Sequence, residues 1–185
     1  GGVEVLAPSR DPRVLYVHVP SYPLTLGHKR NQLLELASGE IVAHFDDDNF
    51  YTPQYLPTMV AQLRESRAQL VELGATFAWD GPTGPVRWYD EVRGRAESFV
   101  HLRGPLTAMK FAEVPCGEEQ NLLKSCVVHA VDDAFGIFLH VNHGGNISPR
   151  GLFSKVDNVG GTLGLEDIPN EQLRDLVRRH SPCFR

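Results

Sequence analysis

The sequence has few of the residues that build a disulfide framework or a zinc site. Its 185 residues include three cysteines, Cys116, Cys126 and Cys183, and no two of them form a Cys-x-x-Cys pair. An odd number of cysteines without that spacing argues against both a closed disulfide framework and a zinc site. We therefore expect three reduced thiols.

Long apolar runs and clustered positive charge are also missing. No stretch of about 18 apolar residues occurs, so the sequence predicts no transmembrane helix. The first residues show no basic stretch followed by an apolar one, so no signal peptide is visible and a cytoplasmic location is expected. The formal net charge of −5, with scattered basic residues, argues against nucleic acid as a partner.

The composition that remains is that of a globular domain. Hydrophobic residues make up 42% and charged residues 22% of the chain, both near the averages for folded proteins. We expect one domain over residues 1–185, in which a C-terminal helix within 165–185 packs on the rest.

Strand and helix patterns alternate along the first half of the chain, which predicts an α/β fold with a mostly parallel sheet flanked by helices. Residues 80–105 lack periodicity and are expected to form a long loop, and residues 144–164 are expected to be irregular. The expected strands are 3–7, 14–19, 41–45, 70–77, 126–131 and 136–141. The expected helices are 25–37, 52–63, 118–125 and one that starts near 169.

Three adjacent carboxylates, Asp46, Asp47 and Asp48, follow the apolar strand 41–45. Like charges at this spacing repel, and a divalent cation completed by substrate phosphates would relieve the repulsion. The carboxyl ends of strands are also where α/β sheets bind ligands. The alternative is a solvated acidic turn that precedes a helix. An EF-hand is excluded because the sixth and twelfth loop positions lack Gly and Glu.

Several motifs in the correct order resemble the central block of family 2 glycosyltransferases, which have the GT-A fold. They are Gly27-His28-Lys29-Arg30-Asn31, Ala37-Ser38-Gly39-Glu40 and Phe45-Asp46-Asp47-Asp48-Asn49-Phe50, followed by Gly117-Glu118-Glu119-Gln120-Asn121-Leu122-Leu123 and His143-Gly144-Gly145-Asn146. The resemblance implies a GT-A fold and the transfer of a sugar from a nucleotide-diphosphate donor, with a uridine diphosphate sugar as the expected donor.

The resemblance also implies roles for individual residues. Asp46 and Asp48 are the ends of an Asp-x-Asp motif and are expected, together with His143, to bind Mn²⁺ or Mg²⁺, with Asp48 as the first candidate for a direct ligand and Asp46 nearer the ribose. Arg30, Asp46 and Asp47 are expected to contact the nucleotide. The alternatives are a solvated helix residue for Arg30 and a surface histidine beside a glycine turn for His143.

Glu119 stands where the family carries the aspartate that acts as general base. A carboxylate there would take the proton of the acceptor hydroxyl as its oxygen attacks the anomeric carbon, and the transfer is expected to invert the anomeric configuration. Alternatively, Glu118 and Glu119 are acidic residues that stabilise a helix N-terminus.

The chain departs from the family at its start. Residues 3–7 resemble the second strand of such a domain, so the first strand and helix of the nucleotide-binding half are not seen, and Pro8-Ser9-Arg10-Asp11 replaces the usual Asp-Asp-x-Ser. An unpaired sheet edge predicts self-association. Two other functions stay open: a shortened, non-catalytic domain that binds a metal or a partner, and metal-dependent phosphoester hydrolysis.

Overall fold

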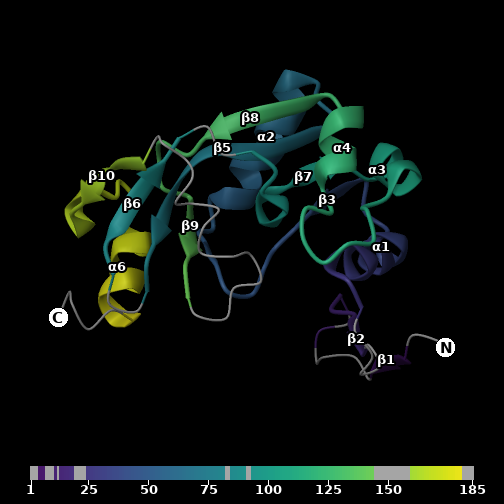
Figure 1. Ribbon diagram of the computed structural model, residues 1–185, viewed down its shortest axis with the longest axis horizontal. Helices are drawn as coiled ribbons and strands as arrows, with labels where there is room; N and C mark the ends of the chain where they lie inside the picture. The colour runs from purple at the N-terminus through teal and green to yellow at the C-terminus, as the bar shows by residue number, and fades with distance from the viewer. Residues whose placement is uncertain are drawn as a thin grey trace.

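The computed structural model describes residues 4–6, 11, 13–18, 24–81, 84–90, 93–143 and 159–180. Within these residues an eight-stranded sheet is flanked by helices (Figure 1). The strands near 3–7 and 14–19 form a separate two-stranded antiparallel sheet, so the expectation that residues 3–7 are the second strand of the domain sheet is wrong. The elements are β1 (Glu4–Leu6), β2 (Tyr16–His18), α1 (Leu26–Leu36), β3 (Ile41–Ala43), β4 (Phe50–Tyr51), α2 (Tyr55–Ser66), β5 (Leu70–Trp79), β6 (Val86–Tyr89), η1 (Ala96–Ser98), β7 (Val100–Leu102), α3 (Arg103–Met109), α4 (Gln120–Ser125), β8 (Val128–Asp132), β9 (Phe138–Val141), β10 (Val159–Leu163), η2 (Leu165–Asp167) and α6 (Glu171–His180).

Strand β5 is the centre of the sheet, and all ten of its residues are buried. Its first half lies between β7, which is antiparallel to it, and β8, which is parallel. Its second half lies between the antiparallel β6 and the parallel β9. Strands β3, β10 and β4 extend the sheet beyond β7, β6 and β9. A strand covered on both faces favours a mostly apolar run, which β5 supplies except at the buried Glu72 and Thr76.

The α/β fold is confirmed, but the sheet is mixed rather than mostly parallel. The difference comes from residues 80–105, which were expected to form a loop. They contain β6 and β7, which both run antiparallel to β5. Strand β6 follows β5 after a short turn, and a short connection between neighbouring strands produces an antiparallel pair.

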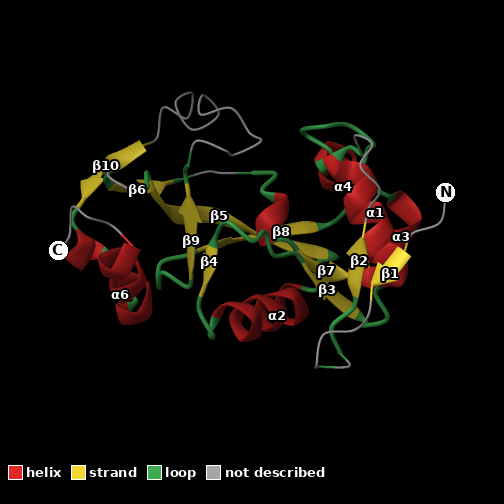
Figure 2. Ribbon diagram, turned by 90° about the horizontal axis from the view of Figure 1, so that it is seen from below, coloured by secondary structure: helices red, strands yellow, loops and turns green. Residues whose placement is uncertain are grey.

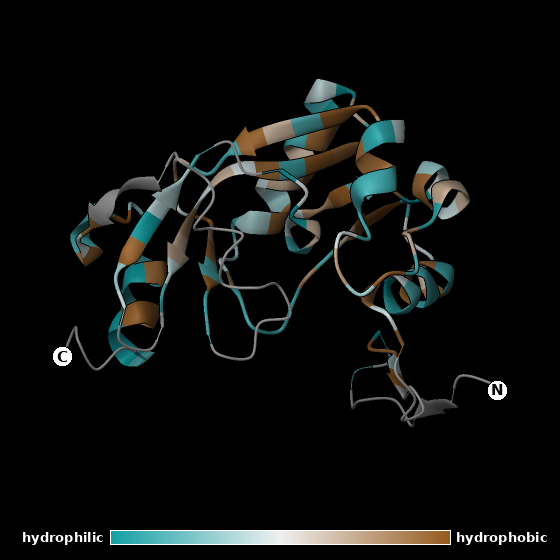
Figure 3. Cartoon of the chain, viewed as in Figure 1, coloured by the Kyte–Doolittle hydropathy of each residue, from teal (hydrophilic) through white to brown (hydrophobic). Residues whose placement is uncertain are grey.

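Helices cover the sheet in separate groups (Figure 2). Helix α2 packs through Tyr55, Met59 and Leu63 on the β5 and β7 region. Helices α1, α3 and α4 gather at one end, and α6 lies at the other, where Leu173 and Val177 are buried. The central strands carry much of the hydrophobic colour in Figure 3, as expected for strands enclosed by helices.

The described residues also bear on the thiol and membrane expectations. Cys116 and Cys126 are free thiols, as expected, and Cys183 lies outside the described residues. Within the same described ranges, no helix combines the length and the apolar character needed to cross a bilayer.

Candidate active site

The three aspartates lie directly after β3, at the edge of the sheet. The side chains of Asp46 and Asp48 are 37% and 34% exposed, whereas Asp47 is exposed to solvent. Burial raises the pKa of Asp46, an effect that Arg30 partly counters. The structure therefore separates the three aspartates into two half-buried carboxylates, Asp46 and Asp48, and one solvent-exposed carboxylate, Asp47. Asp47 would have to make its predicted nucleotide contact from this exposed position.

The loop that carries these aspartates is joined to the end of β9. Strand β4 pairs with β9, with Phe50 opposite Leu139, and Asn49 Oδ1 accepts a hydrogen bond from Val141 N at 3.0 Å. This pairing brings His143 to the aspartates, and its Nε2 lies 3.0 Å from Asp48 Oδ2. Two of the three predicted metal ligands, Asp48 and His143, are thus in contact, although 95 positions separate them in the sequence.

The backbone of Asp46 is held by a tyrosine hydroxyl. Tyr51 Oη accepts a hydrogen bond from Asp46 N at 3.1 Å and donates one to Glu97 O at 2.9 Å. Burial raises the pKa of Tyr51 well above its usual value, so the hydroxyl keeps its proton and the donation to Glu97 persists. Tyr51 therefore connects the aspartate loop to η1.

Arg30 lies between the aspartates and the Glu118-Glu119 segment. Its guanidinium donates from Nε to Glu118 Oε1 at 3.0 Å and from Nη2 to Asp46 Oδ1 at 3.3 Å. The side chains of Arg30 and Glu118 are 8% and 3% exposed, so this is a buried ion pair. The alternative of a solvated helix residue is wrong for Arg30 because the side chain is buried.

A stripe of α1 explains why Arg30 reaches so far inward. The buried residues of this helix are Gly27, Arg30, Asn31 and Leu34, which recur at helical spacing and share one face. A Cβ on Gly27 would lie 1.8 Å from the Ala112 carbonyl oxygen, so only glycine permits this approach. Asn31 exchanges two hydrogen bonds with the Phe111 backbone, at 3.0 and 2.8 Å. The motif thus docks α1 on residues 111–118.

Glu119 lies immediately before α4 and is 7% exposed. Its Oε1 accepts a hydrogen bond from Gln120 Nε2 at 2.9 Å, and its backbone carbonyl accepts from Leu122 N and Leu123 N. Its carboxylate also lies against Gly94, where a Cβ would come within 3.2 Å of Oε1. Glu119 therefore stands at the cap position of α4, but its side chain makes no capping hydrogen bond and no acidic residue lies in the first turn, so the alternative of a stabilised helix N-terminus gains no support and the role as a base stays a prediction.

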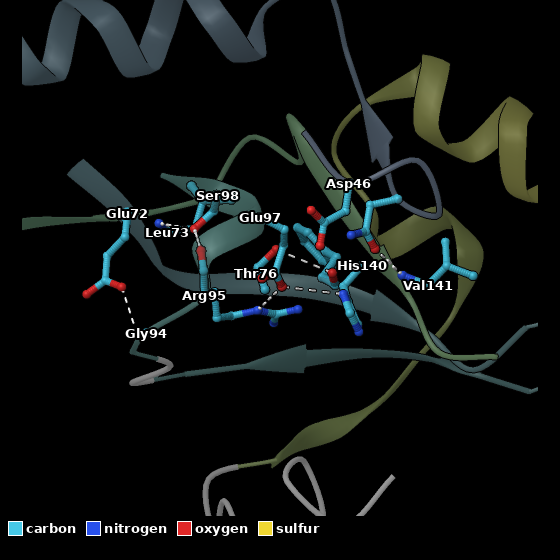
Figure 4. A network of polar contacts seen from close by, with 12 residues as sticks. Asp46, Glu72, Leu73, Thr76, Gly94, Arg95, Glu97, Ser98, His140 and Val141 are labelled. Atoms are coloured by element: carbon cyan, nitrogen blue, oxygen red, sulfur yellow. Dashed lines mark hydrogen bonds and ion pairs between the residues drawn. The ribbon is translucent and has the colours of Figure 1, made fainter. Parts of the chain in front are cut away.

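A buried charged network lies behind Asp46 (Figure 4). Arg95 Nε donates to Glu97 Oε1 at 2.8 Å, and His140 Nδ1 lies 3.7 Å from the same oxygen. Burial raises the pKa of Glu97, but the Arg95 guanidinium outweighs burial and the pKa falls below the usual value. Burial lowers the pKa of His140 to about 3. An ionised Glu97, paired with Arg95, thus faces a neutral His140, and the Glu97 carboxylate contributes to the raised pKa of Asp46.

The structure places the predicted residues other than Asp47 in two contact groups. Asp48 with His143 forms one group, and Arg30, Asp46 and Glu118, which is adjacent to Glu119, form the other. Within the described part of the chain, no three His, Cys, Asp or Glu side chains gather into a preformed metal site. The Gly144-Gly145-Asn146 part of the last motif lies outside the described residues.

Sequence reasoning missed Tyr51, Glu97, His44 and His101. A signal existed for His44, since a polar residue interrupts the apolar run Ile41–Phe45 two positions before Asp46. Residues two apart on an extended segment share a face, and this spacing was the signal that could have placed His44 on the same side as Asp46. No local pattern marks Glu97 or His101.

These features define the class of protein: an α/β domain with paired acidic residues at the end of a sheet strand, facing a histidine from the end of another strand. The sequence profile described as Glycosyl transferase family 2 matches residues 3–136. The chain belongs to glycosyltransferase family 2.

Two individual comparisons agree with this assignment. The chain is 35% identical over 86 residues to the succinoglycan biosynthesis protein ExoM of Rhizobium meliloti (strain 1021), a match that covers 46% of this chain and 26% of ExoM. A crystal structure of S. aureus TarS in complex with UDP-GlcNAc superposes with a TM-score of 0.51 at 15% identity, covering 89% of this chain and 50% of that chain. The second comparison supports the GT-A fold. The chain spans about a quarter of the length of ExoM and about half of the length of the TarS chain.

Proposed function

We propose that this domain transfers a sugar from a nucleotide-diphosphate donor to an acceptor hydroxyl, with a divalent metal ion. The observation that supports this most directly is the contact of Asp48 with His143, beside the Arg30 contact with Asp46. Family membership makes sugar transfer the expected chemistry. The complex of TarS with UDP-GlcNAc makes a uridine diphosphate sugar the first donor to test.

The residues present fit a divalent ion that the substrate completes. Asp48 Oδ2 and His143 Nε2 are 3.0 Å apart, which is about the separation of adjacent ligands on an octahedral ion with bonds of about 2.1 Å. Imidazole suits Mn²⁺ better than Mg²⁺, so Mn²⁺ is the preferred candidate. Two protein ligands leave the other positions to diphosphate oxygens and water, as is common for such ions.

The proposed reaction forms one bond and breaks another. The acceptor oxygen bonds to the anomeric carbon, the bond from that carbon to the diphosphate oxygen breaks, and the acceptor proton passes to a carboxylate, for which Glu119 is the candidate. The ion, when bound, offsets the charge of the leaving diphosphate. Attack opposite the leaving group, with a single base, would invert the anomeric configuration.

One observation favours the non-catalytic alternative. Glu119 is 7% exposed, and its carboxylate already accepts a hydrogen bond from Gln120. A base must reach the acceptor proton within about 3 Å, so Glu119 must become accessible when substrate binds, although such contacts often form only in the complex. If it does not, the domain binds a metal and a nucleotide without catalysing transfer.

Calorimetric titration of uridine diphosphate with and without Mn²⁺ tests the proposal. We expect binding that requires the metal and is lost in Asp48→Asn and His143→Ala, because each removes one proposed ligand. Asp175→Asn on α6, whose carboxylate pairs with Arg178, is the matched control and should bind like the parent. Metal-independent binding, or unchanged binding by Asp48→Asn, would contradict the metal assignment.

Activity separates the enzyme from the binding module. The assay measures the release of uridine diphosphate from UDP-GlcNAc. Release with added saccharide acceptors reports transfer, and release without them reports slow hydrolysis of the donor. Metal-dependent binding without any turnover would support the non-catalytic alternative.

A further inference from the structure

Arg30 has a third protein partner that the proposed function does not use. Its Nη1 lies 3.2 Å from Nδ1 of His44, on the loop side of β3. The other ring nitrogen of His44, Nε2, lies 3.0 Å from Nε2 of His101 on β7. His101 Nδ1 in turn lies 3.0 Å from the Leu102 carbonyl oxygen. A guanidinium, two imidazoles and a carbonyl thus form one continuous chain of hydrogen bonds.

The direction of every hydrogen bond in this chain follows from its two ends. A guanidinium only donates, so His44 Nδ1 must accept and the His44 proton sits on Nε2. A carbonyl oxygen only accepts, so His101 Nδ1 carries the proton and its Nε2 is bare. The central contact then joins the Nε2–H of His44 to the bare Nε2 of His101. Both ends independently require the same direction, and both rings are neutral.

The hydrogen bonds are largely shielded from water, because His101 and Arg30 are buried and His44 is partly buried. His101 is fully buried, and the His44 ring has edge contacts with Phe99 and Phe111 at 6.3 and 5.4 Å between centroids. Burial lowers the pKa of both histidines, in keeping with neutral rings. The Arg30 guanidinium lies 6.0 Å from the Phe111 ring. A buried donor left without a partner would be costly, so each ring depends on the next.

We propose that His44 and His101 are positioning residues that hold the Arg30 guanidinium in the orientation that joins Asp46 to Glu118. Three acceptors from two segments fix one planar group: His44 and Asp46 on the loop after β3, and Glu118 before α4. His101 sets the tautomer of His44 and so keeps Nδ1 available as the acceptor. The effect on nucleotide binding rests on the proposed function, whereas the hydrogen-bond chain does not.

The tautomers give the first test, and it needs no ligand. Long-range ¹H–¹⁵N correlation spectra of the full chain labelled at histidine report which ring nitrogen carries the proton. We expect the proton on Nε2 of His44 and on Nδ1 of His101. A proton on Nδ1 of His44, or on Nε2 of His101, would refute the proposed chain of hydrogen bonds.

Two isosteric pairs of variants test the positioning role. His44→Asn retains an acceptor near the position of Nδ1, and His44→Leu has nearly the same shape without one. We expect His44→Leu to weaken Mn²⁺-dependent binding of uridine diphosphate about ten-fold and His44→Asn to stay within about three-fold of the parent, since hydrogen bonds to charged groups are worth a factor of this order. His101→Gln keeps an acceptor for His44, and His101→Met removes it, so the same contrast is expected.

A second measurement separates this proposal from the proposed function. The Nε–H resonance of Arg30 should be slow to exchange with solvent in the parent and in His44→Asn, and fast in His44→Leu. If the parent binds no nucleotide, the proposed function fails, while this resonance still decides the positioning role. The proposal would be overturned if His44→Asn and His44→Leu showed the same solvent-exchange rate of the Arg30 Nε–H and the same affinity for uridine diphosphate. If His44→Leu does not fold, the His101→Gln and His101→Met pair decides it by the same criteria.

Discussion

The buried ion pair of Arg30 and Glu118 makes a strong prediction about stability. In Arg30→Met, the Glu118 carboxylate, 3% exposed, loses its cationic partner at 3.0 Å. Removing one member of a buried pair costs about 3–5 kcal/mol, because the remaining charge stays buried and unpaired. The second ionic contact of Arg30, to the 37% exposed Asp46, adds little because solvent screens it.

This cost is large for a domain of this size. Each kcal/mol lowers the Tm of a domain of 150–250 residues by about 2–4 °C, so Arg30→Met should lower it by about 6–20 °C. Adding Glu118→Gln removes the stranded charge, so the double variant Arg30→Met/Glu118→Gln should be more stable than Arg30→Met alone. Calorimetric or circular-dichroism melting at constant pH measures all three proteins.

A surface ion pair provides the control. Lys110 Nζ lies 3.1 Å from Glu35 Oε1, with side chains 58% and 59% exposed, so Lys110→Met should cost at most about 1 kcal/mol. Two results would refute the reasoning: a melting temperature of Arg30→Met that matches Lys110→Met, or a double variant that is no more stable than Arg30→Met.

Three further predictions concern the base, the aspartate loop and acid stability. Glu119→Gln should keep donor binding and lower transfer by about 10²–10⁴-fold in a steady-state assay, whereas an equal loss of donor affinity would indicate a structural role. Tyr55→Phe loses one hydrogen bond and Tyr51→Phe loses two, so chemical denaturation should show a loss of about 1 kcal/mol for Tyr55→Phe and about twice that for Tyr51→Phe. Only Tyr51→Phe, whose hydroxyl contacts Asp46, should also weaken Mn²⁺-dependent nucleotide binding. The pKa of His140 is about 3 in the folded protein and 6.5 in the unfolded chain, so between these values the unfolded chain binds more protons and the folded state loses stability as the pH falls. Relative to His140→Gln, the parent should therefore lose about 2 kcal/mol of unfolding free energy between pH 7 and pH 5. A difference in unfolding free energy between parent and variant that stays constant over this range would contradict the prediction.

Local features of the sequence were sufficient to place several elements of the fold. The apolar run of β5 and the helical spacing of Leu173 and Val177 on α6 depend on neighbours in the chain, and both elements form where they were expected. The turn from β3 into Asp46 was also placed correctly, because an apolar strand that ends in consecutive carboxylates marks a sheet edge.

Long-range pairing was what the sequence did not show. Strands β6 and β7 have four and three residues, too few for a period of two to stand out from a loop. Their antiparallel pairing with β5 changed the sheet from the expected mostly parallel form to a mixed one. His101 reaches His44 across 57 positions of the chain, and no local pattern encodes such a contact.

The structural and binding roles of Arg30 are compatible because a guanidinium has more donors than its protein partners use. It carries five N–H groups, of which Glu118, His44 and Asp46 take three. Two remain to donate to a nucleotide, and they point in directions that the three protein acceptors already fix. A pre-oriented donor loses little conformational freedom on binding, which improves affinity without adding a contact. The predicted nucleotide contact of Arg30 therefore requires the buried network around it, because the protein contacts determine where its remaining N–H groups point.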